Sequence, residues 1–241
     1  MTITKIPVAD GTTLPAYLAR PAATPAATGV IVAHELFGVS PDIRGVADDL
    51  AAAGYLAIAP EFYHRDAEPG RWLARDDAGR REGFGYLHRL GRDQALADVA
   101  AAMAALRSEP GIERAAMVGF SAGGHLSYLA ACRLPIGRTA VLYGGWLPAT
   151  DIPLSQPTPT LAETPGITAR LPFIIPVGLG DGVVATPDQP PLPGPRGRLI
   201  VVHGSIVYDA SRVRILAHAS SRAGRLNAGV PGQKNACATA G

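Results

Sequence analysis

The pentapeptide Gly119-Phe-Ser121-Ala-Gly123 carries the clearest chemical signal in the sequence. An apolar run, Ala115–Phe120, precedes the serine, and a segment able to form a helix, Ala122–Cys132, follows it. Gly-x-Ser-x-Gly between a strand and a helix is typical of a nucleophile elbow, a sharp turn that exposes the serine hydroxyl at the carboxyl edge of a sheet. The flanking glycines let neighbouring chains approach without a Cβ collision. We therefore predict that Ser121 is a nucleophile; the alternative is a glycine-rich turn with a capping serine.

A serine hydroxyl needs a general base to attack at neutral pH, and the base needs an acid to orient it. Behind an elbow of this kind, the acid follows the serine in the chain and the histidine comes last. Asp181 directly follows an apolar run and is predicted as the acid, whereas Asp151 follows a loop and is the alternative. Beyond Asp181, His203 stands at the end of another apolar run and is predicted as the base, with His218 as the alternative.

The second chemical signal is His34-Glu35-Leu36-Phe-Gly38, which lies between a predicted strand and a predicted helix. A loop in this position supplies one of the two amides that hold an oxyanion, so we predict the amides of Leu36 and Ala122 in that role. The pair His-Glu is not followed by a second histidine at helical spacing, which argues against a zinc site. The sequence also lacks a phosphate-binding P-loop, so we expect neither a metal nor a cofactor.

The elements that must position these residues alternate between apolar runs and helical patterns. We predict strands over 3–8, 13–20, 29–35, 55–60, 115–120, 139–143, 172–178 and 198–202, and helices over 40–53, 92–107 and 122–132. The first two strands form a hairpin, and polar or proline-rich excursions occupy 63–91 and 148–164. This order implies an α/β fold with a mostly parallel, doubly wound sheet and an N-terminal antiparallel hairpin, in which the catalytic loops gather at the carboxyl ends of the strands.

Taken together, these motifs resemble the dienelactone hydrolase (carboxymethylenebutenolidase) family. The resemblance rests on His34-Glu-Leu-Phe-Gly-Val39, on Gly54-Tyr-Leu-Ala-Ile-Ala-Pro60 with Tyr63, on the elbow, and on Gly178-Leu-Gly-Asp181. It covers residues 1–184 and implies an α/β-hydrolase fold. It also implies a cofactor-free hydrolase that cleaves an enol-lactone or a related small ester through an acyl-enzyme.

By motif position, the resemblance implies Ser121 as the nucleophile, Asp181 as the acid and Glu35 as a carboxylate near the resting nucleophile. The family also uses arginine to bind the substrate carboxylate, and Arg80 and Arg81 lie in that region of the chain. The type enzymes carry cysteine where this chain has serine. An alcohol has a far higher pKa than a thiol, so a glutamate cannot easily take the proton of the Ser121 hydroxyl, and we expect a histidine to do so. With serine as the nucleophile, we expect the substrates to be esters or lactones in general.

The C-terminal part departs from the family, in which a strand is followed by a Gly-His-aromatic loop and a closing helix. Residues 185–241 hold seven of the 22 Lys/Arg but two of the 20 Asp/Glu, and show no amphipathic helix. We predict a core over 1–184 and a C-terminal part of the same domain over 185–241, with an atypical tail. One hypothesis is an altered reading frame beyond about residue 185. A second function class, an inactive hydrolase-like binding protein without a working base, stays open.

The composition places the chain among globular proteins, with 47% hydrophobic and 17% charged residues over 241 positions. A net charge of +2 gives no reason to expect nucleic acid or a membrane surface as a partner. The first residues lack the layout of a signal peptide, and Cys132 and Cys237 stand in unrelated contexts. We expect a cytoplasmic protein without a structural disulfide, a monomer or weak homodimer, whose partner is a small ester or lactone substrate.

Overall fold

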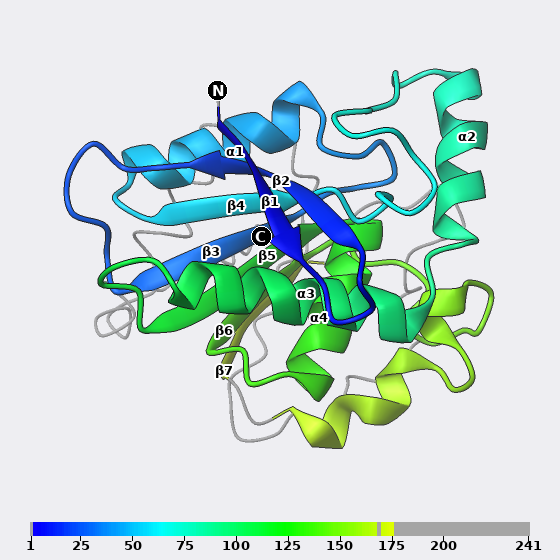
Figure 1. Ribbon diagram of the computed structural model, residues 1–241. Helices are drawn as coiled ribbons and strands as arrows, with labels where there is room; N and C mark the ends of the chain where they lie inside the picture. Colours follow the sequence, from blue (N-terminus) through cyan, green and yellow to red (C-terminus); the bar gives the residue numbers. More distant parts are fainter. Residues whose placement is uncertain (1, 168–169, 176–241) are drawn as a thin grey trace, which may run out of the picture.

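A single seven-stranded sheet organises the computed structural model, which describes residues 2–167 and 170–175. The strands stand in the order β1-β2-β4-β3-β5-β6-β7 (Figure 1). Strand β2 runs antiparallel to both its neighbours, and the pairs from β4 to β7 are parallel. Their bounds are β1 Thr2–Pro7, β2 Thr13–Ala19, β3 Thr28–Ala33, β4 Leu56–Pro60, β5 Arg114–Phe120, β6 Arg138–Leu142 and β7 Arg170–Ile175. The predicted N-terminal hairpin and parallel sheet are confirmed.

Helices cover both faces of the sheet, as the alternating pattern predicted. Helix α1 (Pro41–Ala52) packs on one face, and α3 (Arg92–Arg107) and α4 (Ala122–Arg133) pack on the other (Figure 1). Each face has its own apolar core, because successive side chains of a strand point to opposite sides. In β3, for example, Val30 and Val32 join the core under α1, whereas Ile31 joins the core under α3 and α4. This is the doubly wound arrangement of an α/β-hydrolase.

The predicted helix boundaries hold where the sequence carries end signals. The Ser40 hydroxyl accepts the Ile43 amide at the start of α1, Pro41 occupies the first turn, and Gly54 takes a φ of +93° just after the helix end. Helix α3 has the predicted bounds, since its buried positions recur at helical spacing. Capping residues and apolar periodicity are local signals, and they were sufficient to predict the bounds of these two helices.

The polar excursion over 63–91 contains helix α2 (Asp77–Leu87), which was not among the predicted helices. Its buried stripe begins with Gly79 and Gly83, which give no apolar periodicity to read from the sequence. A Cβ on Gly79 would lie 2.0 Å from the Ala74 carbonyl, and one on Gly83 would lie 2.8 Å from the Leu36 carbonyl. The glycines therefore let α2 pack directly on backbone, beside the loop that follows β3.

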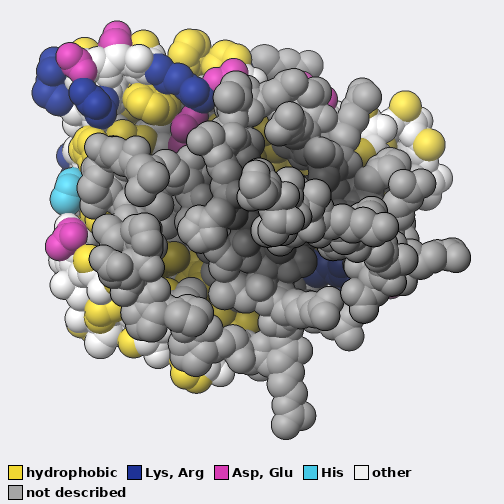
Figure 2. Space-filling view, turned by 180° about the vertical axis from the view of Figure 1, so that it is seen from behind, with side chains coloured by type: hydrophobic (Ala, Val, Ile, Leu, Met, Phe, Trp, Pro, Cys, Tyr) yellow, Lys and Arg dark blue, Asp and Glu magenta, His cyan; other side chains and the backbone are white. Residues whose placement is uncertain are grey.

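The exposed side of α2 carries ion pairs, which explains its polar composition. Figure 2 shows Lys and Arg atoms close to Asp and Glu atoms on the side where Figure 1 places α2. The ion pairs are Arg71–Glu82, Arg80–Asp77 and Arg89–Asp66, with N–O distances of 2.7 Å. Such exposed pairs contribute little to stability, so the glycine-mediated contacts hold this segment more than its charges do.

The proline-rich excursion after β6 forms two short 3-10 helices, η1 (Pro153–Ser155) and η2 (Thr160–Gly166). The buried Arg92 side chain, at the start of α3, ties them down. Its guanidinium donates to the Leu154 carbonyl at 2.8 Å and to the Thr158 carbonyl at 2.7 Å, and it forms an ion pair with Glu163. The excursion is thus fastened to the core beside α4.

Two predictions concern residues outside the described part of the chain. The strand predicted over 172–178 corresponds to β7, of which Arg170–Ile175 are described, and the strand predicted over 198–202 lies outside the described residues. The C-terminal part predicted over 185–241 also lies outside the described residues, so the division at 184 stays a prediction.

Candidate active site

Ser121 occupies a strained backbone position between β5 and α4. Its φ is +52° and its ψ is −113°, a region that side-chain-bearing residues seldom adopt and that costs on the order of 1–3 kcal/mol. The Ser121 amide donates to the Leu142 carbonyl at 2.9 Å, and the Ser121 carbonyl accepts the His125 amide at 2.9 Å. The strain is therefore held by the neighbouring strand β6 and by the first turn of α4, as a nucleophile elbow requires.

The elbow glycines are required by close backbone contacts. A Cβ on Gly119 would lie 2.0 Å from the Gly123 carbonyl oxygen, and a Cβ on Gly123 would lie 2.4 Å from the Ala33 oxygen and 2.5 Å from the His34 oxygen. Ala33 and Gly119 are also partners in the β3–β5 register. The turn that presents Ser121 therefore lies against the start of the His34–Leu36 loop, where sequence reasoning expected the oxyanion amides.

The amides of Leu36 and Ala122 are the predicted oxyanion donors. Among the described residues, neither amide donates a hydrogen bond, and the same holds for the Ser121 hydroxyl. Leu36 follows β3, and Ala122 is the first residue of α4, where the helix dipole favours negative charge. Both amides thus stand at the carboxyl edge of the sheet beside the half-buried Ser121.

His34 is buried behind this loop and makes two backbone hydrogen bonds. Its Nδ1 lies 2.7 Å from the Glu35 carbonyl oxygen, and its Nε2 lies 3.2 Å from the Phe62 amide nitrogen. The ring also packs against Tyr63, with 4.8 Å between ring centroids. Burial lowers the pKa of His34 to about 4, so the ring is neutral at pH 7.

Glu35 forms an ion pair with Arg75, which also contacts Asp42 at 2.8 Å and lies over the Phe37 ring. The Glu35 side chain is 14% exposed; burial raises the pKa of its carboxyl, and the Arg75 charge opposes that rise without cancelling it. The hydroxyl of the buried Tyr63 has no hydrogen-bond partner among the described residues, and the Glu35 charge adds to burial in raising its pKa. In this structure Glu35 is bonded to Arg75 and not to Ser121.

Arg75, the ion-pair partner of Glu35, was not predicted from the sequence, in which Arg80 and Arg81 were the candidate arginines. Arg80 pairs with Asp77 on the surface, and Arg81 is exposed. Arg75 precedes α2 by two residues and sits 40 positions beyond Glu35 in the chain. No local pattern distinguishes it from its neighbours; only the packing of α2 against the loop after β3 brings it to the site.

Aromatic side chains line the same edge from two sides. Trp146 follows β6 with a φ of +57° and meets Phe84 of α2 edge-on, at 6.3 Å between ring centroids. On the α2 side, Phe84 directly follows Gly83, which packs against the Leu36 backbone. On the β6 side, Trp146 stands four residues beyond Leu142, whose carbonyl accepts the Ser121 amide. These half-buried rings give the edge an apolar wall, which the sequence analysis did not identify.

Two other described histidines, His125 and His64, make polar contacts within the fold. His125 is fully buried, with Nδ1 2.6 Å from the Gly145 carbonyl and Nε2 2.8 Å from the Thr160 hydroxyl, and burial lowers its pKa to about 4. His64 contacts the buried Asp98 at 3.3 Å. Within 2–167 and 170–175, no group of three or more His, Cys, Asp or Glu could hold a metal ion, and no helix is long and apolar enough to cross a membrane.

The remaining predicted members of the site lie outside the described residues. These are Asp181 and His203, together with the alternative base His218. Asp151, the alternative acid, is exposed just before η1. The described part of the chain thus places the turn at Ser121 against the start of the loop that carries Glu35 and Leu36, and the assignments of acid and base stay predictions.

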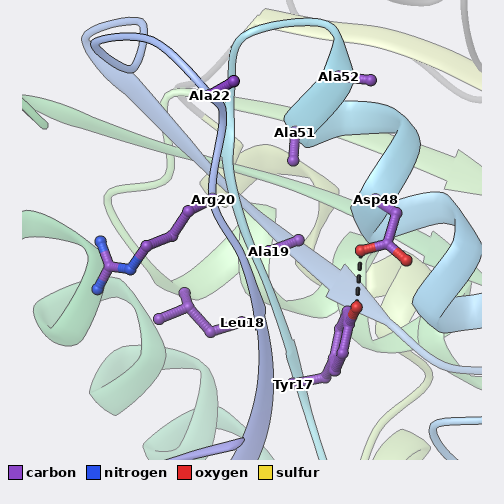
Figure 3. A pocket seen from close by; sticks show the side chains of 8 residues that line it. All are labelled: Tyr17, Leu18, Ala19, Arg20, Ala22, Asp48, Ala51 and Ala52. Atoms are coloured by element: carbon purple, nitrogen blue, oxygen red, sulfur yellow. Dashed lines mark hydrogen bonds between the residues drawn. The ribbon is translucent and has the colours of Figure 1, made fainter. Parts of the chain in front are cut away.

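A surface hollow elsewhere on the molecule has different surroundings. Figure 3 shows it between the end of β2 and the second half of α1, lined by Tyr17, Leu18, Ala19, Arg20, Ala22, Asp48, Ala51 and Ala52. Its polar groups are already paired, since the Tyr17 hydroxyl donates to Asp48 at 2.7 Å and Arg20 pairs with Glu109. Ala19 pairs with Ala57 near the start of β4, so the hollow lies at the opposite edge of the sheet from Ser121.

Comparison with known proteins agrees with this geometry. The sequence pattern of the dienelactone hydrolase family matches residues 14–194, well over half of the chain. The chain belongs to the dienelactone hydrolase family. The fold is therefore that of an α/β-hydrolase, and the roles of Ser121 and of the loop after β3 stay predictions.

Individual family members show how far the similarity extends. The chain is 37% identical over 157 residues to the "Putative carboxymethylenebutenolidase" of Salmonella typhi, covering 64% of this chain and 56% of that protein. It is 31% identical over 137 residues to the carboxymethylenebutenolidase of Pseudomonas putida, covering 56% and 57%. The chain thus spans less than three fifths of the length of these two relatives.

Among solved structures, the "Putative Dienelactone Hydrolase" of Klebsiella pneumoniae superposes with a TM-score of 0.61 at 29% identity. The superposition covers 72% of this chain and 70% of that chain. A TM-score of 0.61 indicates that the two proteins share the same overall fold.

Proposed function

We propose that this protein hydrolyses small carboxylic esters or lactones through Ser121. The observation that carries the proposal is the strained backbone of Ser121, at φ +52°, next to two amides that are free of hydrogen bonds within the described residues. A fold maintains such strain where it serves the reaction, because the strain exposes the hydroxyl and aligns it with the oxyanion donors. Membership of the dienelactone hydrolase family supports the same reaction class.

In the proposed mechanism, Ser121 Oγ attacks the ester carbonyl carbon while His203 accepts the hydroxyl proton. The amides of Leu36 and Ala122 hold the oxyanion of the tetrahedral intermediate. His203 then protonates the leaving alkoxide, which yields an acyl-enzyme, and a water molecule deprotonated by His203 releases the acid. Asp181 fixes the tautomer of His203 and stabilises the imidazolium. The roles of Asp181 and His203 rest on chain order and family resemblance, and no cofactor is required.

Glu35 and Arg75 shape the substrate preference in this proposal. Arg75 is half exposed, so an anionic substrate group can reach its guanidinium in competition with Glu35 and Asp42. The aromatic wall of Phe84 and Trp146 favours a flat or apolar substrate body. With serine in place of the type enzymes' cysteine, Glu35 serves as a charge partner for Arg75 rather than as the group that activates the nucleophile.

The test compares Ser121→Ala with Ser127→Ala, which removes the same kind of atom six residues further along the chain, within α4. The Ser127 hydroxyl is buried and has no hydrogen-bond partner among the described residues. With p-nitrophenyl acetate, Ser121→Ala should lower kcat/KM by about 10⁴-fold or more, and Ser127→Ala should keep wild-type activity. A fluorophosphonate should label wild type and Ser127→Ala but not Ser121→Ala.

Retained turnover in Ser121→Ala would refute the assignment of the nucleophile. A wild-type protein that is folded but neither turns over the ester nor reacts with the fluorophosphonate would instead indicate a hydrolase-like binding protein without a working base.

A further inference from the structure

We propose that His34 is the positioning residue of the oxyanion hole, because its ring fixes the orientation of the peptide between Glu35 and Leu36. The inference rests on the proposed function, in which the Leu36 amide holds the oxyanion. It assigns a role to a buried side chain that does not itself touch the substrate.

The backbone on both sides of His34 determines its tautomer. The Phe62 amide can only donate, so His34 Nε2, 3.2 Å away, must present a lone pair. The Glu35 carbonyl can only accept, so His34 Nδ1, 2.7 Å away, must carry the hydrogen. A neutral imidazole satisfies both contacts in one orientation, and the residue is only 3% exposed, so bulk water has little access to either contact.

The bond to the Glu35 carbonyl also orients the next amide. A trans peptide is planar, and its C=O and N–H point in opposite directions. Holding the Glu35 oxygen toward the His34 ring therefore turns the Leu36 N–H away from the ring. The Gly38 amide donates to the same oxygen at 3.3 Å, a longer bond than that from His34. The hydrogen bond from the imidazole is thus the shorter of the two that hold the Glu35 carbonyl.

The elbow lies directly against this segment. The Gly123 Cα approaches so closely that a Cβ would lie 2.5 Å from the His34 carbonyl oxygen. A flip of the Glu35–Leu36 peptide would therefore present a carbonyl oxygen where the reaction needs a donor. Loss of one oxyanion donor costs about 10²–10³ in kcat, which sets the size of the effect expected from His34.

Two substitutions distinguish the role of Nδ1 from the role of Nε2. In His34→Asn, the amide nitrogen can stand close to the position of Nδ1 and keep the donor to Glu35. In His34→Gln, the longer side chain reaches the position of Nε2 and keeps the contact with Phe62. Each variant removes one of the two hydrogen bonds of the buried His34 ring, so both should lower the melting temperature.

The expected result is a difference in kcat between these variants. The Asn variant should stay within about fivefold of wild-type kcat, and the Gln variant should lose about 10²-fold with KM changed by less than about threefold. The Gln variant should also lose part of the preference for an ester over the matching thionoester, because sulfur is a weaker hydrogen-bond acceptor than oxygen. General damage to the fold would lower both reactions equally.

A Gln variant as active as the Asn variant, or equal losses on ester and thionoester, would overturn the proposal. If the variants do not fold, ¹⁵N NMR of the wild-type imidazole tests the same geometry without a substitution: hydrogen on Nδ1 supports the proposal, and hydrogen on Nε2 overturns it. An inactive wild type would refute the proposed function itself, and is recognised before any variant is made.

Discussion

Gly123→Ala tests the contact between the elbow and the oxyanion loop. The added Cβ would lie 2.4 Å from the Ala33 oxygen and 2.5 Å from the His34 oxygen, whereas ordinary contacts begin at 3.4 Å. The two backbones must therefore separate by about 1 Å, and overpacking of this kind costs about 1–3 kcal/mol. A displacement of about 1 Å at a reacting centre lowers the rate by about 10²-fold. We expect both losses in this one variant.

Gly45→Ala is the matched control, because Gly45 lies within helix α1 and a Cβ there meets no atom within 4 Å. Alanine should stabilise either helix by about 0.5–1 kcal/mol relative to glycine, so the difference between the two variants isolates the steric effect. The assays are urea unfolding and kcat/KM on p-nitrophenyl acetate. The reasoning is refuted if Gly123→Ala is as stable as Gly45→Ala and keeps kcat/KM within about threefold of wild type.

Two further predictions concern stability. Burial lowers the pKa of His34 and of His125 to about 4 from an ordinary value of 6.5, so the unfolded chain binds protons that the folded chain excludes. The free energy of unfolding should therefore fall by about 2 kcal/mol for each imidazole between pH 6.5 and 5, and urea titrations with a flat profile in that window would contradict this. Arg92→Met removes the buried partner of Glu163, which keeps its pair with the exposed Arg133, and also removes the donors to the Leu154 and Thr158 carbonyls. It should cost about 3 kcal/mol by the same titrations at pH 7. Arg80→Met, at the exposed pair with Asp77, should leave the unfolding midpoint unchanged, and equal midpoints for the two variants would show that the buried network does not fasten the excursion.

Much of the fold could be predicted because it depends on local patterns. The alternation of apolar runs and helical periodicity indicated the parallel sheet, and Ser40-Pro41 and Gly54 marked the ends of α1. The elbow was also readable, since Gly119, Ser121 and Gly123 lie within five residues. Helix α2 was not, because its buried stripe begins with glycines that carry no hydrophobic signal.

For the candidate site, the sequence by itself determined the residue types that can perform the chemistry and their order along the chain. Only the tertiary structure decided which partners they have. Arg75, which pairs with Glu35, is 40 residues away from it along the chain, and Phe62, whose amide donates to His34, is 28 residues away from it. Turns, caps and periodicity depend on neighbours in the chain, and a sequence records those directly. Contacts between the ends of separate strands depend on strand order and helix packing, which are set by the folding of the whole sheet.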